Sequence, residues 1–173
     1  MAPSRRHAQN KITPFLWFDK KAEEAMTFYV SIFKNSRIVS ISRYPDDPPG
    51  GPTTGMEGKV LGAVFELEGQ PFMALDGGPL FEPTPAVSFY VECETQEEVD
   101  YYWDRLSKGG DPKAQRCGWL QDRYGFSWQI IPTALVRLLS DPDEEKAGRA
   151  MQAMLKMKKI DIATLERAHQ GKR

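Results

Sequence analysis

The chain has 173 residues, of which 40% are hydrophobic and 27% are charged, and its formal net charge is −1. This balance is typical of a globular protein, and a chain of this length buries roughly 70% of its unfolded surface without needing disulfides. The even charge argues against nucleic-acid binding, which needs a concentrated basic surface. No run reaches the ~20 apolar residues of a membrane helix. With only two cysteines, the chain is predicted to be cytoplasmic, without nucleic-acid or membrane partners.

The first part of the chain predicts a strand, a helix and three further strands. Residues 1–10 lack the apolar run of a signal peptide and predict a flexible tail. The apolar segment 11–18 predicts a buried strand, and Asp19 is expected to cap a helix over residues 20–33. The three further strands are expected at 37–44, 59–67 and 71–75.

Two connecting segments in this part are rich in proline and glycine. Residues 45–58 hold four prolines and four glycines, which cannot sustain a strand ladder, so we predict a mobile loop. The loop could close over a ligand, but mobility without a function is the alternative that we favour. Residues 76–85 form a connector whose Asp-Gly-Gly-Pro sequence is expected to be a turn. It lacks the Lys-Ser/Thr pair and the following helix of a phosphate loop.

The second part predicts the same order of elements, followed by helices alone. Residues 86–93 predict a strand, and Thr95 with Glu98 forms a capping box for a helix that runs to about residue 108. Strands are expected at 114–119, 120–123 and 126–131. After Pro132 a helix capped by Asp141 is expected to pack an apolar stripe on the sheet or on a second subunit. The stripe comprises Ala147, Ala150, Met151, Met154 and Leu155.

The two parts are an internal repeat. Shifting the first strand and helix by 74 positions places Phe15 on Phe89 and Tyr29 on Trp103, and a shift of 56 places Met73 on Gln129. A long period that occurs twice indicates a duplicated module rather than a solenoid. Each module alone would expose one apolar sheet face, so we expect the two sheets to pair and leave a cleft, the default ligand site.

These patterns together predict an α+β fold. It consists of two tandem βαβββ modules that form a cupped, partly open mixed β-sheet barrel, plus C-terminal helices. The modules span about 11–78 and 86–132 within a paired domain over 11–132, and residues 133–173 form a helical extension.

Four separated segments resemble the PhnB-like proteins, which have often been labelled 3-demethylubiquinone-9 3-methyltransferase. The segments are ITPFLWFDKKAEEAMTFYVSIFKNS, FELEGQPFMALDGGP, SFYVECETQEEVDYYWDRLSKGG and CGWLQDRYGFSWQIIPTAL. These proteins belong to the vicinal oxygen chelate superfamily of glyoxalase I, bleomycin-resistance proteins and extradiol dioxygenases. The resemblance covers about 11–168 and implies the paired βαβββ fold.

The resemblance also implies where a metal would bind, and this sequence departs from it there. The family pattern in the last strand is Asp-x-x-Gly-x-x-Trp-Glu, in which Glu binds the metal, and Gln129 stands at that position. Its internal counterpart is Met73, and the first strands offer Thr13 or Phe15 and Val87 or Phe89. A divalent ion prefers carboxylate or imidazole ligands. The histidines, His7 and His169, lie in the tails, so we predict no metal and no other cofactor.

The candidate ligand-binding residues of the cleft follow from these positions. They are Phe15, Trp17, Met73, Asp76, Phe89 and Gln129. The aromatic residues and Met73 would form an apolar pocket for a small planar or hydrophobic ligand, and plain core packing is the alternative for each. Gln129 is either a hydrogen-bonding group of the pocket or a structural residue. Cys117 lacks a neighbouring base on its own side of the strand, so we expect no catalytic thiol there.

Four functions remain open at this point. The first is a small-molecule-binding protein, or a metal-independent enzyme, that holds an unknown small molecule in the cleft between the modules. The second is a metal-dependent lyase or dioxygenase. The third is the methyltransferase of the family label, which we disfavour because residues 19–21 after the first strand contain no glycine for the adenosyl cofactor. The fourth is a structural or regulatory dimer, and we expect a homodimer in any case.

Overall fold

The computed structural model describes residues 11–47 and 51–172, so the predicted tail at 1–10 lies outside the described residues. The chain divides into two compact units, Met1–Glu82 and Pro83–Arg173, and each is described by itself. Both units contain a sheet of parallel and antiparallel strands packed on a helix, which confirms the α+β class.

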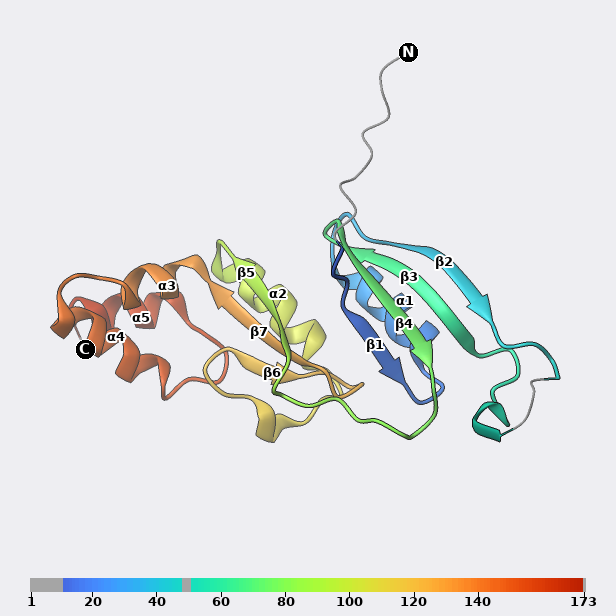
Figure 1. Ribbon diagram of the computed structural model, residues 1–173. Helices are drawn as coiled ribbons and strands as arrows, with labels where there is room; N and C mark the ends of the chain where they lie inside the picture. The colour runs from blue at the N-terminus through green and yellow to red at the C-terminus, as the bar shows by residue number, and fades with distance from the viewer. Residues whose placement is uncertain (1–10, 48–50, 173) are drawn as a thin grey trace, which may run out of the picture. The chain divides into compact units, whose positions relative to one another are not determined.

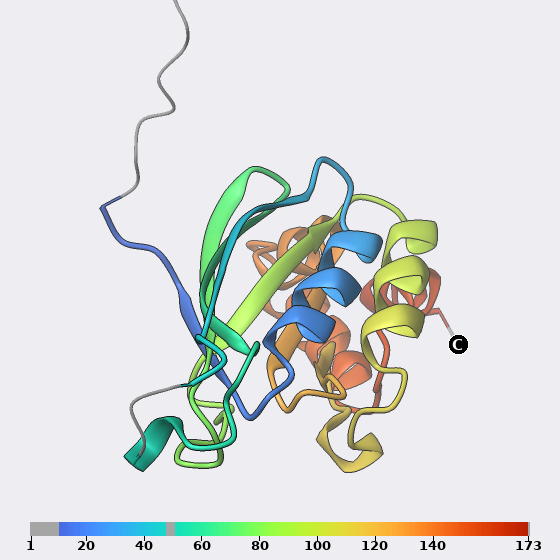
Figure 2. The ribbon, with the colours of Figure 1, turned by 90° about the vertical axis from the view of Figure 1, so that its right-hand side faces the viewer.

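The first unit is a four-stranded sheet with one helix (Figure 1). The strands are β1 (Phe15–Phe18), β2 (Arg37–Arg43), β3 (Val60–Leu67) and β4 (Gln70–Asp76), in the order β1-β4-β3-β2. β1 pairs in parallel with β4, and the other pairs are antiparallel. Helix α1 (Ala22–Ile32) covers one face with its buried residues, among them Ala25, Met26 and Tyr29. Figure 2 shows this helix from a second side, in blue, against the strands of its sheet.

The first helix is capped by a residue far away in the sequence. The expected cap, Asp19, is exposed, and the residue preceding α1, Lys21, makes no side-chain capping bond. Instead the Ala22 N–H donates to the Asp76 Oδ1 carboxylate oxygen at 2.8 Å. The second oxygen, Oδ2, accepts from the Val60 N–H at 3.1 Å. The prediction for Asp19 was therefore wrong, because a carboxylate at the end of β4 lies against the helix N-terminus and is buried with it.

Part of the predicted loop at 45–58 packs on the first unit. Residues 48–50 lie outside the described residues, and Gly51–Thr53 form a short 3₁₀ helix. Met56 is only 2% exposed, and its carbonyl accepts from the Lys59 N–H at 2.9 Å. The C-terminal end of the loop is thus anchored to the core.

The second unit begins with the repeat of this arrangement. Its strands are β5 (Ser88–Cys93), β6 (Trp119–Gln121) and β7 (Ser127–Pro132), in the order β5-β7-β6, and β5 is parallel to β7. Helix α2 (Gln96–Leu106) packs on the sheet through Val99, Trp103 and Leu106. The first half of the predicted capping box is present, since Thr95 Oγ1 accepts from the Glu98 N–H at 3.3 Å. The Glu98 carboxylate accepts from the N–H of Glu94, one residue before the cap, at 2.7 Å.

The second sheet has three strands where four were expected. Pro112–Ala114 form a 3₁₀ helix, and the predicted strand at 114–119 is reduced to a single bridge between Arg116 and Trp119. Cys117 and Gly118 have φ values of 50° and 84°, so the chain reverses there instead of extending. Their N–H groups donate to the carbonyls of Met157 and Lys158, at 2.9 and 2.8 Å. The C-terminal segment therefore takes the place of a neighbouring strand.

Three helices complete the second unit: α3 (Thr133–Leu139), α4 (Glu144–Met154) and α5 (Ile162–His169). They share one apolar cluster with the end of β7, formed by Ile131, Leu135, Leu138, Ala150, Ile160 and Leu165. Of the predicted stripe, Ala150 is buried and Met154 packs on the cluster, but Met151 and Leu155 are about half exposed. None of the described helices is long and apolar enough to cross a membrane.

The cap of α4 lies two residues later than the sequence indicated. Asp143, rather than Asp141, accepts from the N–H groups of Glu145 and Lys146, at 3.1 and 3.2 Å. Asp141 accepts from the Asp143 N–H at 2.9 Å and also contacts His169 Nε2 at 2.9 Å. The expectation that Asp141 caps the helix was wrong because Pro142 lies outside the helix rather than at its first position.

We predict that Asp76→Ala destabilises the protein much more than Asp19→Ala. Removing the buried carboxylate leaves two N–H groups without their partner, which costs roughly 2–4 kcal/mol, whereas an exposed carboxylate that caps nothing costs under about 0.5 kcal/mol. Urea unfolding followed by circular dichroism measures both variants. Equal losses of unfolding free energy in the two variants would contradict the assignment of the cap.

Candidate functional site

The sheet face of the first unit that lies opposite α1 is apolar and partly open. Phe15 pairs with Met73 and Trp17 pairs with Leu75 across the parallel β1–β4 ladder. Side chains of paired residues point to the same face of a sheet. Neighbouring residues on the strands, such as Leu16 and Ala74, are buried on the helix face. Phe15 is 50% exposed, and Trp17, Met73 and Leu75 are partly exposed. The structure therefore brings together three predicted site residues, Phe15, Trp17 and Met73.

Trp17 is held in place by the turn that follows β4. Its indole Nε1–H donates to the carbonyl of Gly78 at 2.9 Å, and its ring meets the Phe81 ring edge-on at 4.9 Å between centroids. A Cβ atom on Gly77 would overlap the indole. The two glycines after β4 thus leave room for the Trp17 ring and bind its N–H group, in agreement with the interpretation of this segment as a turn.

Asp76 lies on the other side of the same sheet. It is 2% exposed and follows Phe72 and Ala74 on the buried face of β4. Both carboxylate oxygens accept backbone N–H groups, as described for the cap of α1. The tyrosine Tyr44 donates its hydroxyl to the Asp76 carbonyl at 3.1 Å. Asp76 is therefore separated from Phe15 and Met73 by the sheet, and its carboxylate organises the backbone of the first unit.

The register of the two sheets changes the internal correspondence of the strands. The helices of the repeat match at a shift of 74, since α1 begins at Ala22 and α2 at Gln96. Met73 pairs with Phe15, and its counterpart Gln129 pairs with Tyr90, so the strands match at a shift of 75. A slip of one residue moves a side chain to the opposite face of a sheet. Tyr90 thus takes the place that the sequence had given to Phe89.

Phe89 consequently lies on the face of the second sheet that α2 covers. It pairs with Trp128, which is 2% exposed, and the two rings lie 4.9 Å apart between centroids. Gln129 follows Trp128 in the strand and points to the other face. Phe89 and Gln129, which the sequence placed in one cleft, are therefore on opposite faces of one sheet. Tyr90 was missed because the first strand and helix were aligned with their repeat at one shift of 74. That alignment hides the one-residue slip between the strands.

Gln129 belongs to a polar group on the open face of the second sheet. Its Nε2–H donates to the Ser88 Oγ atom at 2.8 Å. Gln129 pairs with Tyr90 of β5, which is 51% exposed. On its other side Gln129 pairs with Trp119 of β6. Partial burial, followed by the negative charge of Glu92, raises the pKa of the Tyr90 hydroxyl. Tyr90 therefore stays a neutral hydrogen-bond donor at physiological pH, beside an amide that can both donate and accept.

The Asp-x-x-Gly-x-x-Trp pattern before Gln129 has a structural role. Asp122 is 2% exposed, and its Oδ1 atom accepts from the N–H groups of Tyr124 and Phe126, at 2.8 and 3.1 Å. Its Oδ2 atom accepts the Trp128 indole N–H at 2.8 Å. Gly125 provides the φ of 91° that the turn requires. The motif fixes the start of β7 and hence the position of Gln129.

The residues at the metal positions that the sequence resemblance implies do not fit a divalent ion. The register-matched positions hold Phe15, Met73, Tyr90 and Gln129, which supply neither a carboxylate nor an imidazole. Over residues 11–47 and 51–172, no three His, Cys, Asp or Glu side chains are grouped so that they could hold a metal. His169 lies on α5, and His7 falls outside the described residues.

The two cysteines are free thiols in the second unit. Cys93 is fully buried, and this burial, followed by the charges of Glu98 and Glu92, raises the pKa of its thiol to about 12. A thiol with such a pKa is protonated and unreactive at neutral pH. Cys93 is therefore a small buried residue of the core.

Comparisons with known proteins agree on one family. The model of the 3-demethylubiquinone-9 3-methyltransferase family matches residues 10–131. The structure of the PhnB protein of Bacillus cereus, which carries the same methyltransferase label, is 47% identical. It aligns over 71% of this chain and 99% of its own, with a TM-score of 0.61.

More distant structures are also similar to this chain. The protein PA1353 of Pseudomonas aeruginosa is 21% identical over 68% of this chain and 92% of its own, with a TM-score of 0.54. The fosfomycin resistance protein FosX of Listeria monocytogenes is 18% identical over 70% of this chain and 89% of its own, with a TM-score of 0.45. No curated protein matches the chain. The family match covers both halves of the repeat, and the chain therefore belongs to the PhnB-like, or 3-demethylubiquinone-9 3-methyltransferase, family.

Proposed function

We propose that this protein binds a small apolar or planar molecule without the help of a metal. The observation that carries the proposal is the open face of the first sheet, where Phe15, Trp17, Met73 and Leu75 lie side by side on two paired strands. Phe15 exposes half of its surface there. A native protein gains from covering such a surface, and each 100 Å² of apolar area removed from water contributes about 2.5 kcal/mol.

The rigidity of this face supports ligand binding. Trp17 is fixed by the Gly78 carbonyl and by the Phe81 ring, so its orientation is set before a ligand arrives. Phe15 and Met73 are attached to a ladder whose backbone hydrogen bonds restrict their Cα positions. Binding to a preformed surface loses less conformational entropy than binding that must first order the side chains. A planar ring stacked on Trp17 or Phe15 fits this surface best.

The polar group of the second sheet is a separate candidate, for binding a molecule with a hydrogen-bonding substituent. Gln129 uses its Nε2 atom for Ser88, and among the described residues its Oε1 atom accepts from none. The neutral Tyr90 hydroxyl is the neighbouring donor. An amide and a phenol can orient a carbonyl or hydroxyl group by hydrogen bonds. A metal-independent enzyme could use the same amide and phenol in its chemistry.

We predict that substitutions on the open face of the first sheet weaken ligand binding. A library of aromatic metabolites and antibiotics, with the dye 1-anilinonaphthalene-8-sulfonate as a defined planar probe, is screened by thermal shift and fluorescence. Phe15→Ala combined with Met73→Ala is expected to weaken binding of a hit by at least about tenfold, because it removes ~50–100 Å² of contact. The matched control is Val136→Ala, which shortens an apolar residue on α3 that is 48% exposed.

Gln129→Ala tests the polar group in the same screen, with the exposed Gln152→Ala on α4 as its control. A hit that binds the second sheet through a carbonyl or hydroxyl group is expected to lose about 1–2 kcal/mol of binding free energy in the first variant and nothing in the second. Unchanged affinity in both the double variant and Gln129→Ala, or a library without a single stabilising compound, would refute the proposal.

A metal-dependent lyase or dioxygenase is the alternative for this superfamily. Phe15, Met73, Tyr90 and Gln129 speak against it on chemical grounds, because they offer no carboxylate or imidazole. We predict less than about one tenth of an equivalent of Ni, Fe, Mn or Zn per chain in protein purified without chelators, since a site lacking carboxylate and imidazole ligands holds such ions weakly. Elemental analysis measures the content. A stoichiometric metal that resists dialysis would favour the alternative.

The methyltransferase of the family name is the third candidate. Adenosyl cofactors are usually held at a glycine-rich turn after the first strand of a parallel sheet. Here β1 leads into Asp19, Lys20 and Lys21, and the sheet is mixed. We predict no heat of binding for S-adenosylmethionine in isothermal titration calorimetry. Saturable binding of one equivalent would overturn this prediction.

Self-association stays a prediction. Light scattering coupled to gel filtration distinguishes a homodimer from a monomer, and neither result changes the prediction for ligand binding by the first sheet.

A further inference from the structure

Three side chains with available hydrogen-bonding groups lie in one row across the second sheet. Gln129 of β7 pairs with Tyr90 of β5 on one side and with Trp119 of β6 on the other. Paired residues point to the same face, which here is the open face opposite α2. Among the described residues, the Tyr90 hydroxyl, the Trp119 indole N–H and the Gln129 Oε1 atom have no hydrogen-bond partner. All three groups are thus available to a ligand.

The Gln129 amide can recognise one kind of molecular edge. Its nitrogen has two N–H donors, of which one binds Ser88 Oγ at 2.8 Å, so one donor and the Oε1 acceptor remain. A carboxamide used in this way pairs with a molecule that carries an adjacent acceptor and donor, as glutamine does with adenine. Lactams and amino-substituted heterocycles have such an edge.

The aromatic residues on both sides of Gln129 favour a planar ring. Neighbouring strands lie about 4.8 Å apart, so the backbones of Tyr90 and Trp119 are separated by roughly 10 Å. A flat ring above Gln129 is then about 5 Å from each of them, within the range of roughly 4.5–7 Å between the centroids of aromatic pairs. Tyr90 is 51% exposed, so half of its surface is open to such a contact.

The charge on this face disfavours anions. Glu92 lies two residues after Tyr90 on β5, which places it on the same face, and it is exposed. Partial burial, followed by the charge of Glu92, raises the pKa of the Tyr90 hydroxyl. A phosphate or carboxylate would meet the same repulsion, whereas a neutral or cationic ring would not.

The segment between α4 and α5 holds the turn that precedes Trp119. The N–H groups of Cys117 and Gly118 donate to the carbonyls of Met157 and Lys158, at 2.9 and 2.8 Å. Both carbonyls lie beyond the end of the match to the family model. The position of Trp119 in the row therefore depends on an addition to the family fold.

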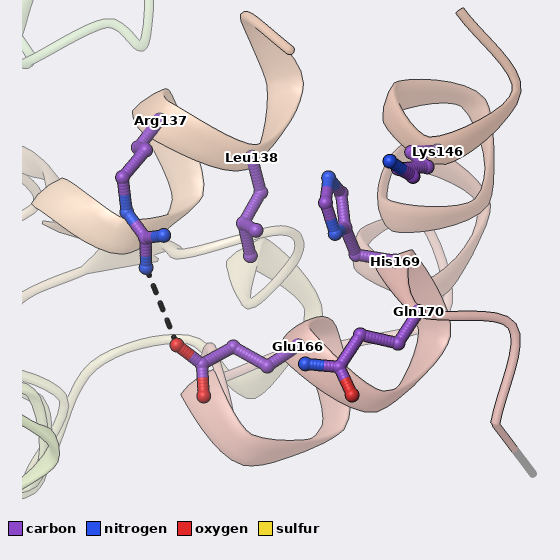
Figure 3. A pocket seen from close by; sticks show the side chains of 6 residues that line it. All are labelled: Arg137, Leu138, Lys146, Glu166, His169 and Gln170. Atoms are coloured by element: carbon purple, nitrogen blue, oxygen red, sulfur yellow. Dashed lines mark hydrogen bonds and ion pairs between the residues drawn. The ribbon is translucent and has the colours of Figure 1, made fainter. Parts of the chain in front are cut away.

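The charged groups of the C-terminal helices are occupied with one another. Helices α3, α4 and α5 surround a pocket of about 310 Å³, whose lining Figure 3 shows. Its basic side chains are each paired with a carboxylate: Arg137 with Glu166, Lys146 with Asp143 and His169 with Asp141. These pairs balance the charge of the pocket, so the contribution of the C-terminal segment to a site is its hold on the turn before Trp119.

We propose that the open face of the second sheet binds a neutral or cationic planar heterocycle with adjacent hydrogen-bond donor and acceptor groups, such as a nucleobase, through Tyr90, Gln129 and Trp119. This inference rests on the separate candidate given for this face under the proposed function, and it adds the chemical class of the ligand. It does not depend on the apolar face of the first sheet.

The test titrates the whole chain, labelled with nitrogen-15, with adenine and, separately, with cytosine, and follows the indole N–H signals by nuclear magnetic resonance. The signal of Trp119 is the one that is lost in Trp119→Phe. A saturable shift of this signal with at least one base is expected. Benzoate, an anionic ring without the donor–acceptor edge, is expected to cause none.

Two variants with matched controls test the row, and a dispersed spectrum shows that each of them is folded. Gln129→Ala is expected to weaken binding of the base by at least about fivefold, because it removes the donor and the acceptor, and the exposed Gln152→Ala on α4 should not. Tyr90→Ala is expected to weaken binding similarly, because it removes one ring, and Tyr101→Ala on α2, which packs on the opposite face, should not.

Phe15→Ala combined with Met73→Ala separates this inference from the proposal for the first sheet. The double variant should leave the affinity for the base unchanged, whereas it weakens binding of a ligand held by the first sheet. Absence of a saturable shift with both bases, or equal affinities in either variant of the row and its control, would overturn the inference. Either result would leave the proposal for the first sheet intact, since that proposal is tested by its own hits.

Discussion

In each unit the first strand pairs in parallel with the last, and this pairing decides which side chains face the helix and which remain open. β1 lies beside β4 and β5 beside β7, with each pair in a fixed register. Because side chains alternate along a strand, a register also assigns every residue to a face. Phe15 and Met73 share the open face of the first sheet for this reason, as Tyr90 and Gln129 do in the second. The chemistry of both faces follows from this one constraint.

Buried carboxylates hold this arrangement at the points where strands meet other elements. Asp76 joins the end of β4 to the N-terminus of α1 and to the start of β3. Asp122 joins the β6–β7 turn to the indole of Trp128. In both cases the acid accepts N–H groups that would otherwise be buried without a partner, at a cost of about 1–3 kcal/mol each. Asp76, which the sequence made a candidate site residue, thus serves the fold, as Asp122 does.

The C-terminal helices add a second kind of surface to the family fold. The segment between α4 and α5 accepts the N–H groups of Cys117 and Gly118 where a fourth strand was expected, and apolar side chains of the helices pack with Ile131 at the end of β7. This docking explains why the second sheet has three strands. It also produces a cavity lined by charged groups, in contrast to the apolar face of the first sheet.

Local patterns in the sequence determined the class of the fold, the repeat and most element positions. The duplicated helices occur at the predicted shift of 74, and Thr95 caps α2 as expected. Both features were predictable because apolar periodicity and capping act over a few residues. The substitution of Gln129 for a metal-binding glutamate was also visible in the sequence. Tertiary structure alone decided that Asp76 rather than Asp19 caps α1, and that Tyr90 rather than Phe89 accompanies Gln129. The physical reason is that a cap can come from any segment that packs nearby, and that a slip of one residue between paired strands reverses their faces while leaving the local sequence unchanged.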